Sequence, residues 1–179
     1  MLGHGAGGGI QAPDLQSAAN AANAAGFSVA LVEQPYRVAG RRSQAPARQL
    51  DEAWVAVAGQ LFEGLPLIAG GRSAGARVAC RTAAETRAVA VLCLAFPVHP
   101  PGRPEKSRLA ELDAVQVPTL VVQGERDPFG IPPKTRNRKV VLVPGNHSLR
   151  SVKAVETAVS DWLGSSHWDE TLSRSTRKA

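Results

Sequence analysis

Five short apolar runs recur along the chain. They are five to seven residues long, and their apolar character is nearly continuous rather than alternating with polar positions. Runs of this length and composition are typical of strands that are buried on both faces of a sheet. The predicted strands are residues 28–32, 65–69, 89–95, 118–122 and 139–143.

Segments with helical periodicity separate these runs. In residues 47–62, for example, Leu50, Trp54, Val57 and Leu61 follow one another at spacings of four, three and four. The other predicted helices are residues 14–25, a helix that begins at Ser73, residues 108–114 and residues 152–163. Strands that alternate with helices favour a parallel sheet with helices on both faces. We therefore predict an α/β fold, a three-layer sandwich around a mostly parallel sheet of about six strands.

Length and composition indicate one globular domain. The chain has 179 residues, of which 44% are hydrophobic and 20% charged, as expected for a globular protein with a single core. We assign residues 1–164 to this domain and residues 165–179 to a polar, flexible C-terminal tail. A glycine-rich loop, His4 to Gly9, follows the first residues almost directly. Little or no first strand is therefore expected to precede it.

Charge and hydropathy bear on location and partners. No apolar run approaches the roughly 18 residues of a membrane span, and the first residues do not resemble a secretory signal. We therefore predict a cytoplasmic protein without membrane contact. The formal net charge is +6, but the basic residues are scattered and no aromatic residues lie among them. This pattern favours a solvated basic surface over nucleic-acid binding.

The strongest chemical motif is G-x-S-x-G around Ser73, between a predicted strand and a predicted helix. A serine hydroxyl is a nucleophile only when it is exposed, held rigidly and deprotonated by a neighbour, and a tight strand-to-helix turn provides the first two conditions. Gly71 and Gly75 lack side chains that would collide at such a turn. The backbone N–H of Ala74, at the start of the helix, is positioned to stabilise an oxyanion.

A serine nucleophile needs a histidine base and an acid that orients it. His147 follows the last predicted strand, and Asp127 follows the strand before it. Glu125 is the fallback for the acid. The order Ser, Asp, His along the chain, each after a strand, is the order typical of one class of serine hydrolases. Taken singly, each feature has a plainer interpretation. The motif around Ser73 could be a chance Gly-Gly turn, Asp127 a turn residue before Pro128, and His147 a neighbour of a helix cap.

Other polar residues lie near the same predicted edge. The N–H of Ala6, or next Gly7, in the glycine-rich loop is the candidate second oxyanion donor. We expect His4 to brace this loop, and we assign no role to His167. The candidate substrate-binding residues, which follow strand ends or flank Ser73, are Tyr36, Arg37, Arg72, Phe96, His99 and Phe129.

Several motifs together resemble the α/β-hydrolase superfamily. They are HGAGGG, PYR at residues 35–37, GGRSAGARVA, FPVHPPGRPE at residues 96–105, VPTLVVQGERDPFG and GNHSL. The likeness is closest to small, lidless bacterial members related to dienelactone hydrolases, and to a hydrolase-like family named after a testis-expressed protein and a histone-acetyltransferase-complex subunit. The resemblance implies a serine-hydrolase fold without the N-terminal strand pair and lid, and an esterase or related acyl hydrolase activity. Dienelactone hydrolases use a cysteine nucleophile, so their substrate is not carried over to Ser73.

These features lead to two functional hypotheses. The first is a serine hydrolase that acts on a small ester through an acyl-enzyme, without metal or organic cofactor. The second is a non-catalytic binding or scaffold protein that retains the fold. Arg37 and Arg72 indicate an anionic substrate, or alternatively make structural ion pairs with Glu33 or with carboxylates near Asp127, and the sequence leaves both open. A second copy of the chain could cover the open sheet edge.

Overall fold

The computed structural model describes residues 1–62 and 64–165. Residue 63 and residues 166–179, which include His167 and almost all of the predicted tail, lie outside the described residues. The strands are β1 (Leu2–Gly3), β2 (Leu31–Val32), β3 (Ile68–Arg72), β4 (Ala90–Leu94), β5 (Thr119–Gly124) and β6 (Arg138–Val143). The helices are α1 (Pro13–Ala24), α2 (Pro35–Val38), α3 (Ala47–Leu61), α4 (Ala74–Thr82), α5 (Leu109–Asp113) and α6 (Val152–Leu163). None of these described helices is both long and apolar enough to cross a bilayer.

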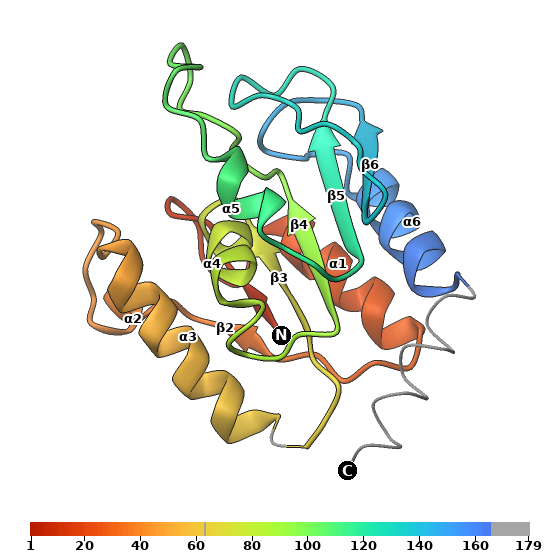
Figure 1. Cartoon of the computed structure of the whole chain (residues 1–179). Helices are drawn as coiled ribbons and strands as arrows, with labels where there is room; N and C mark the ends of the chain where they lie inside the picture. The colour runs from red at the N-terminus through yellow and green to blue at the C-terminus, as the bar shows by residue number, and fades with distance from the viewer. Residues whose placement is uncertain (63, 166–179) are drawn as a thin grey trace.

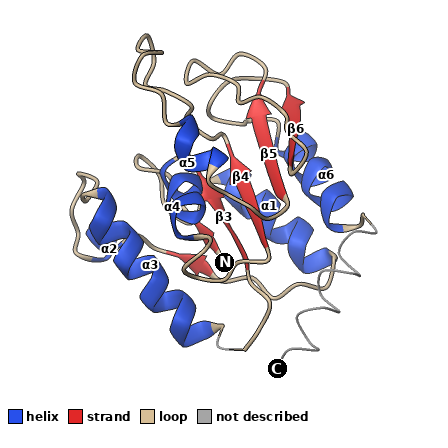
Figure 2. Cartoon of the chain, viewed as in Figure 1, coloured by secondary structure: helices blue, strands red, loops and turns tan. Residues whose placement is uncertain are grey.

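The strands form one sheet with helices packed around it (Figures 1 and 2). Its strand order is β2-β1-β3-β4-β5-β6, and every neighbouring pair is parallel. The predicted fold class and strand number are thereby confirmed. Because all strands run the same way, the loops that follow their carboxyl ends meet at one edge of the sheet, where open α/β sheets bind ligands.

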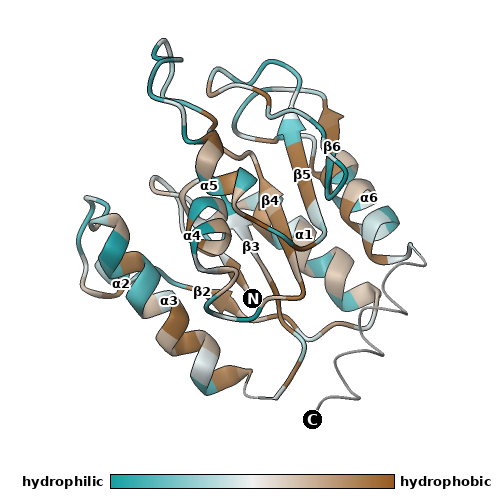
Figure 3. Ribbon diagram, viewed as in Figure 1, coloured by the Kyte–Doolittle hydropathy of each residue, from teal (hydrophilic) through white to brown (hydrophobic). Residues whose placement is uncertain are grey.

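Side-chain alternation along the strands divides the core into two layers. In β4, Val91 and Cys93 belong to the apolar cluster shared with α3, α4 and α5, whereas Leu92 and Leu94 belong to the cluster shared with α1 and α6. All four are buried, and Figure 3 shows the hydrophobic colour along this strand. Helices therefore cover both faces, as expected for strands without polar alternation.

The structure adds one element that the sequence pattern did not predict. The short helix α2 begins at Pro35, whose fixed φ suits the first position of a helix. It buries Tyr36 and leaves Arg37 exposed. One turn of helix has too few residues to show apolar periodicity, so the sequence carried little signal for it.

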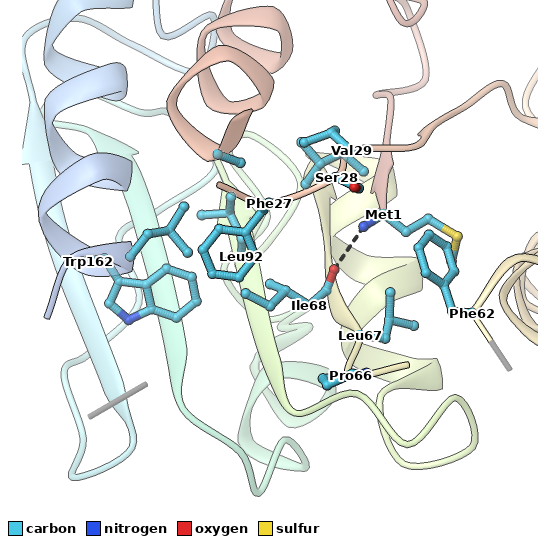
Figure 4. Close-up of a pocket in the computed structure, with 13 residues that line it drawn as sticks. Met1, Phe27, Ser28, Val29, Phe62, Pro66, Leu67, Ile68, Leu92 and Trp162 are labelled. Carbon is cyan, nitrogen blue, oxygen red and sulfur yellow. Dashed lines mark hydrogen bonds between the residues drawn. The ribbon is translucent and has the colours of Figure 1, made fainter. Parts of the chain in front are cut away.

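A small apolar cavity lies at the other edge of the sheet, beside the amino ends of β1 and β3 (Figure 4). Its walls include Phe27, Phe62 and Trp162, and the amine of Met1 donates a hydrogen bond of 2.9 Å to the carbonyl of Ile68. Its volume is about 60 Å³, whereas ligand pockets usually measure about 300 to 1,000 Å³. The cavity is thus smaller than a usual ligand pocket, and the candidate functional site lies at the carboxyl edge.

Candidate active site

Ser73 lies at the sharp turn between β3 and α4. Its backbone has φ 51° and ψ −105°, a conformation that residues other than glycine rarely adopt. Backbone strain of this kind is common at functional sites. The sharp turn between strand and helix holds the hydroxyl in a fixed position. The side chain is partly exposed.

The two glycines of the motif let this turn approach the neighbouring strand. A Cβ atom on Gly71 or on Gly75 would collide with the carbonyl oxygen of Gly3 in β1. Larger residues would therefore push the turn away from the sheet. Gly71 and Gly75 thus have the role expected from the sequence, which is to avoid a side-chain collision at this turn.

His147 reaches Ser73 from the loop between β6 and α6. Its Nε2 lies 2.9 Å from Ser73 Oγ, across a separation of 74 residues in the chain. Gly124, the last residue of β5, allows this loop to pack closely against the strand, because a Cβ atom on Gly124 would collide with the backbone of Asn146. This role of Gly124 was not predicted from the sequence.

Asp127 lies on the other side of the same imidazole. Its Oδ2 is 2.9 Å from His147 Nδ1, and its side chain is fully buried. A carboxylate only accepts hydrogen bonds, so Nδ1 carries the proton and Nε2 is free to accept the proton of Ser73. Glu125, the fallback acid, is exposed, and the carboxylate that pairs with His147 is that of Asp127.

Two neighbours fix the Asp127 carboxylate. The N–H of Phe129 donates to Oδ1 at 2.8 Å, and Nε2 of Gln123 donates to Oδ2 at 2.8 Å. Gln123 also donates to the carbonyl of Gly130 at 2.8 Å. Sequence reasoning missed Gln123, although a polar residue directly after an apolar strand run was a usable signal.

Of the predicted substrate-binding residues, two lie close to the imidazole or to its neighbours. The ring of Phe129 stacks on His147 with centroids 4.0 Å apart. His99 donates its backbone N–H to the carbonyl of Phe129 at 3.0 Å. Contact of these residues with a substrate stays a prediction.

Tyr36 and Phe96 occupy more interior positions. Phe96 is fully buried in the core, and Tyr36 is 4% exposed. The hydroxyl of Tyr36 donates to the carbonyl of Ala6 at 3.1 Å, so Tyr36 helps to hold the glycine-rich loop. Contact with a substrate would require these side chains to move.

His4 also holds the glycine-rich loop. It is fully buried, its Nε2 accepts from the N–H of Gln34 at 2.9 Å, and its Nδ1 contacts the carbonyl of Gly5 at 2.8 Å. The neutral tautomer with the proton on Nδ1 satisfies these two hydrogen bonds. Glu33 Oε1 lies 3.2 Å from the same Nε2. The loop is thus braced by a histidine, as the sequence analysis expected.

Both predicted arginines have carboxylate neighbours. Arg37 Nε lies 3.9 Å from Glu33. Arg72 Nε lies 2.7 Å from Asp14 Oδ2, and its Nη2 donates to the carbonyl of His147 at 3.2 Å. Of the two interpretations left open by the sequence, the structure contains the ion pairs, but the partner of Arg72 is Asp14 rather than a carboxylate near Asp127.

The Arg72–Asp14 pair connects several parts of the site. The exposed fractions of the two side chains are 17% and 2%, and burial raises the pKa of the Asp14 carboxyl although the Arg72 guanidinium lowers it. Gly5 of the glycine-rich loop has no room for a Cβ, which would lie 2.7 Å from Arg72 Nη1. Arg72 thus contacts α1, the glycine-rich loop and the His147 loop.

Replacing Arg72 with methionine is expected to lower the free energy of unfolding by about 3 to 5 kcal/mol, because it leaves the Asp14 carboxylate buried without a partner. Urea denaturation of the purified variant measures this loss. The double variant Arg72→Met with Asp14→Leu should recover part of it, since removing both charges removes the unpaired one. A loss below about 1 kcal/mol in the single variant would show that the pair is weakly coupled to the fold.

Three backbone N–H groups, one directly after Ser73 and two in the glycine-rich loop, have no acceptor among the described residues. They belong to Ala6, Gly7 and Ala74. Ala74 is the first residue of α4, where N–H groups lack an intrahelical partner. These amides are the candidate oxyanion donors of the sequence analysis. Within the same described residues, no three His, Cys, Asp or Glu side chains gather as a metal site.

Comparison with known proteins identifies the family and the fold. Residues 1–169 match the family model of the alpha/beta hydrolase domain. A protein of the α/β hydrolase superfamily from Xanthomonas campestris pv. campestris is 21% identical, with 90% of this chain and 95% of that chain covered and a TM-score of 0.69. An α/β serine hydrolase homologue from Coxiella burnetii is 14% identical, with coverages of 92% and 85% and a TM-score of 0.71. A lidless α/β serine hydrolase from Xanthomonas campestris is 20% identical, with coverages of 92% and 84% and a TM-score of 0.66.

The chain belongs to the alpha/beta hydrolase domain family, because the family model spans residues 1–169. The broad resemblance noted from the motifs is confirmed. The narrower likeness to dienelactone hydrolases and to the testis-expressed-protein family stays a prediction. No curated protein gave a significant match. The solved structures, at these identities, establish the fold alone.

Proposed function

We propose that this protein is a serine hydrolase that cleaves a small carboxylic ester, or a related acyl substrate, through an acyl-enzyme. One observation carries the proposal: a single imidazole, that of His147, lies 2.9 Å from Ser73 Oγ and 2.9 Å from Asp127 Oδ2. Membership of the alpha/beta hydrolase domain family supports a hydrolytic reaction.

In the acylation step, Ser73 Oγ attacks the carbonyl carbon while His147 Nε2 accepts its proton. The buried Asp127 carboxylate stabilises the imidazolium that forms and holds the ring in the productive tautomer. The negative charge on the carbonyl oxygen is stabilised by the N–H of Ala74 and by that of Ala6 or Gly7. The tetrahedral intermediate then collapses, and the leaving alcohol takes the proton from Nε2.

In the deacylation step, a water molecule takes the place of the alcohol. His147 Nε2 accepts one proton from this water as its oxygen attacks the acyl carbon, and the same proton returns to Ser73 Oγ when the acid leaves. The net reaction is ester and water to acid and alcohol. The residues of this chain thus account for every proton transfer.

Two measurements test the proposal directly. A fluorophosphonate probe should label the folded protein, and mass spectrometry should locate the adduct on the peptide that contains Ser73. A series of nitrophenyl esters of increasing acyl length should show turnover, with the short acyl groups preferred because no lid or long groove was found in the sequence. Folded protein that neither reacts with the probe nor hydrolyses any ester would instead support the binding or scaffold hypothesis.

A further inference from the structure

A cleft of about 640 Å³ lies between the glycine-rich loop, the beginning of α1 and the segment that follows His147. This volume falls within the usual range of ligand pockets, about 300 to 1,000 Å³. Its lining combines the glycine-rich loop, the beginning of α1 and the neighbours in sequence of Ser73 and His147. The lining residues are Gly7, Gly8, Ala12, Pro13, Asp14, Arg72, Ser148 and Arg150. Through Arg72 and Ser148, the cleft adjoins the two chain segments that carry Ser73 and His147.

The charges at one side of this cleft compensate each other. Arg72 and Asp14 form an ion pair of 2.7 Å in which both side chains are largely buried. A second N–H group of Arg72 is directed to the carbonyl of His147. The charge of Arg72 is thus compensated by Asp14, and Arg72 contributes no free positive charge for a ligand.

Arg150 supplies the uncompensated charge of the cleft. Its side chain is exposed, and no carboxylate of residues 1–62 or 64–165 lies within ion-pair distance of it. A free guanidinium has N–H donors in a planar fork that matches the two oxygens of a carboxylate. In the glycine-rich loop, which also lines the cleft, a Cβ at Gly7 would meet nothing within 4 Å, so the loop leaves space there for a ligand.

The backbone that carries Arg150 is held in place. Leu149 is fully buried, and its N–H donates to the carbonyl of Asn146 at 3.1 Å. The N–H of Val152, at the start of α6, donates to the carbonyl of Arg150 at 2.9 Å. The guanidinium therefore extends from a fixed point three residues after His147.

We propose that the substrate carries a second, anionic group, a carboxylate, and that Arg150 binds this group in the cleft while the ester carbonyl lies at Ser73. The proposal rests on the proposed serine-hydrolase function and adds the class of substrate. The carboxylate belongs to either the acyl part or the alcohol part of the ester, and the experiment distinguishes the two.

The test compares matched charged and neutral esters. For the acyl part, the nitrophenyl half-ester of glutarate is compared with nitrophenyl pentanoate. For the alcohol part, 4-acetoxybenzoate is compared with phenyl acetate. Each pair is assayed with the wild type, with Arg150→Gln and with Arg48→Gln. The last variant is the control, because the side chain of Arg48 is 90% exposed on α3 and does not line the cleft.

The Arg150→Gln variant is expected to lose about tenfold in kcat/KM on one of the two anionic esters, mainly through KM, and less than twofold on its neutral partner. Loss of a charge-assisted hydrogen bond has an effect of this size. The Arg48→Gln variant should leave both esters of the pair unchanged. High salt should reduce the wild-type preference for the anionic ester, since the cleft is open to solvent.

The outcomes separate this proposal from the one on which it rests. Equal losses on charged and neutral esters, or no loss on either anionic ester, would overturn the role of Arg150 while ester turnover still supports a serine hydrolase. If no ester is hydrolysed and the probe does not react, the serine-hydrolase proposal fails. Binding of glutarate and of 4-hydroxybenzoate, measured by calorimetry on the wild type and Arg150→Gln, then tests the cleft by itself. Equal or undetectable binding to both proteins overturns it.

Discussion

Ser73→Ala is expected to lower kcat for ester hydrolysis roughly 10⁴- to 10⁶-fold. The substitution removes the oxygen that attacks the carbonyl and leaves the Cβ, so the strained turn at φ 51° keeps the same steric demands. The free energy of unfolding should therefore change little. Steady-state assays with nitrophenyl acetate, together with thermal melting of the same preparation, measure both quantities.

A matched serine controls for the substitution itself. Ser160 lies on an exposed position of α6, outside the cleft and the hydrogen-bonded site, and Ser160→Ala should keep wild-type kcat. Labelling by the fluorophosphonate probe should disappear in Ser73→Ala and persist in Ser160→Ala. If Ser73→Ala retained more than about a hundredth of the activity, the nucleophile would be another group and the proposed mechanism would be wrong.

The middle of the sheet was predictable because its strands are buried on both faces. The predicted strand at residues 89–95 corresponds to β4 (Ala90–Leu94), and the predicted strand at residues 118–122 corresponds to β5 (Thr119–Gly124). Continuous apolar runs follow directly from burial by helices on each side. These strands therefore carry a clear signal in the sequence, because they have strand neighbours on both sides and helices on both faces.

The two strands that pair with β1 begin at other residues than predicted. The predicted strand at residues 28–32 is paired only at Leu31–Val32, because its partner β1 is limited to Leu2–Gly3. The strand predicted at residues 65–69 is instead β3 (Ile68–Arg72), which continues through two glycines. Glycine usually signals a break in a strand, but here β1 and β4 pair with these residues from both sides.

The positions of Ser73, Asp127 and His147 could be predicted because each follows a strand of a parallel sheet, and such strands end at one edge. The residues that support them depend on tertiary contacts. Asp14 lies 58 residues from its partner Arg72, and as a residue in the first turn of a helix it gave no sign of an ion pair. Likewise, the role that we propose for Arg150 depends on the cleft and on the pairing of Arg72 with Asp14.

Asp127→Asn is expected to lower kcat about 10⁴-fold while the fold is retained. Asp127 Oδ2 accepts hydrogen bonds from His147 Nδ1 and from Gln123 Nε2, and an asparagine NH₂ group at this position cannot accept either. If this amide donates to Nδ1 instead, the proton of the imidazole moves to Nε2, which can then no longer accept the proton of Ser73. Steady-state kinetics and urea denaturation of the same variant separate the chemical effect from any loss of stability.

Glu125→Gln is the matched control for this prediction, because it removes the same charge from an exposed residue of the same loop. It should keep wild-type kcat, whereas Asp127→Asn should not. The reverse result would transfer the orienting role to Glu125 and contradict the observed hydrogen bond between Asp127 and His147. If both variants stayed fully active, the imidazole would need no acid to orient it, and Asp127 would serve only to anchor its loop through Phe129 and Gln123.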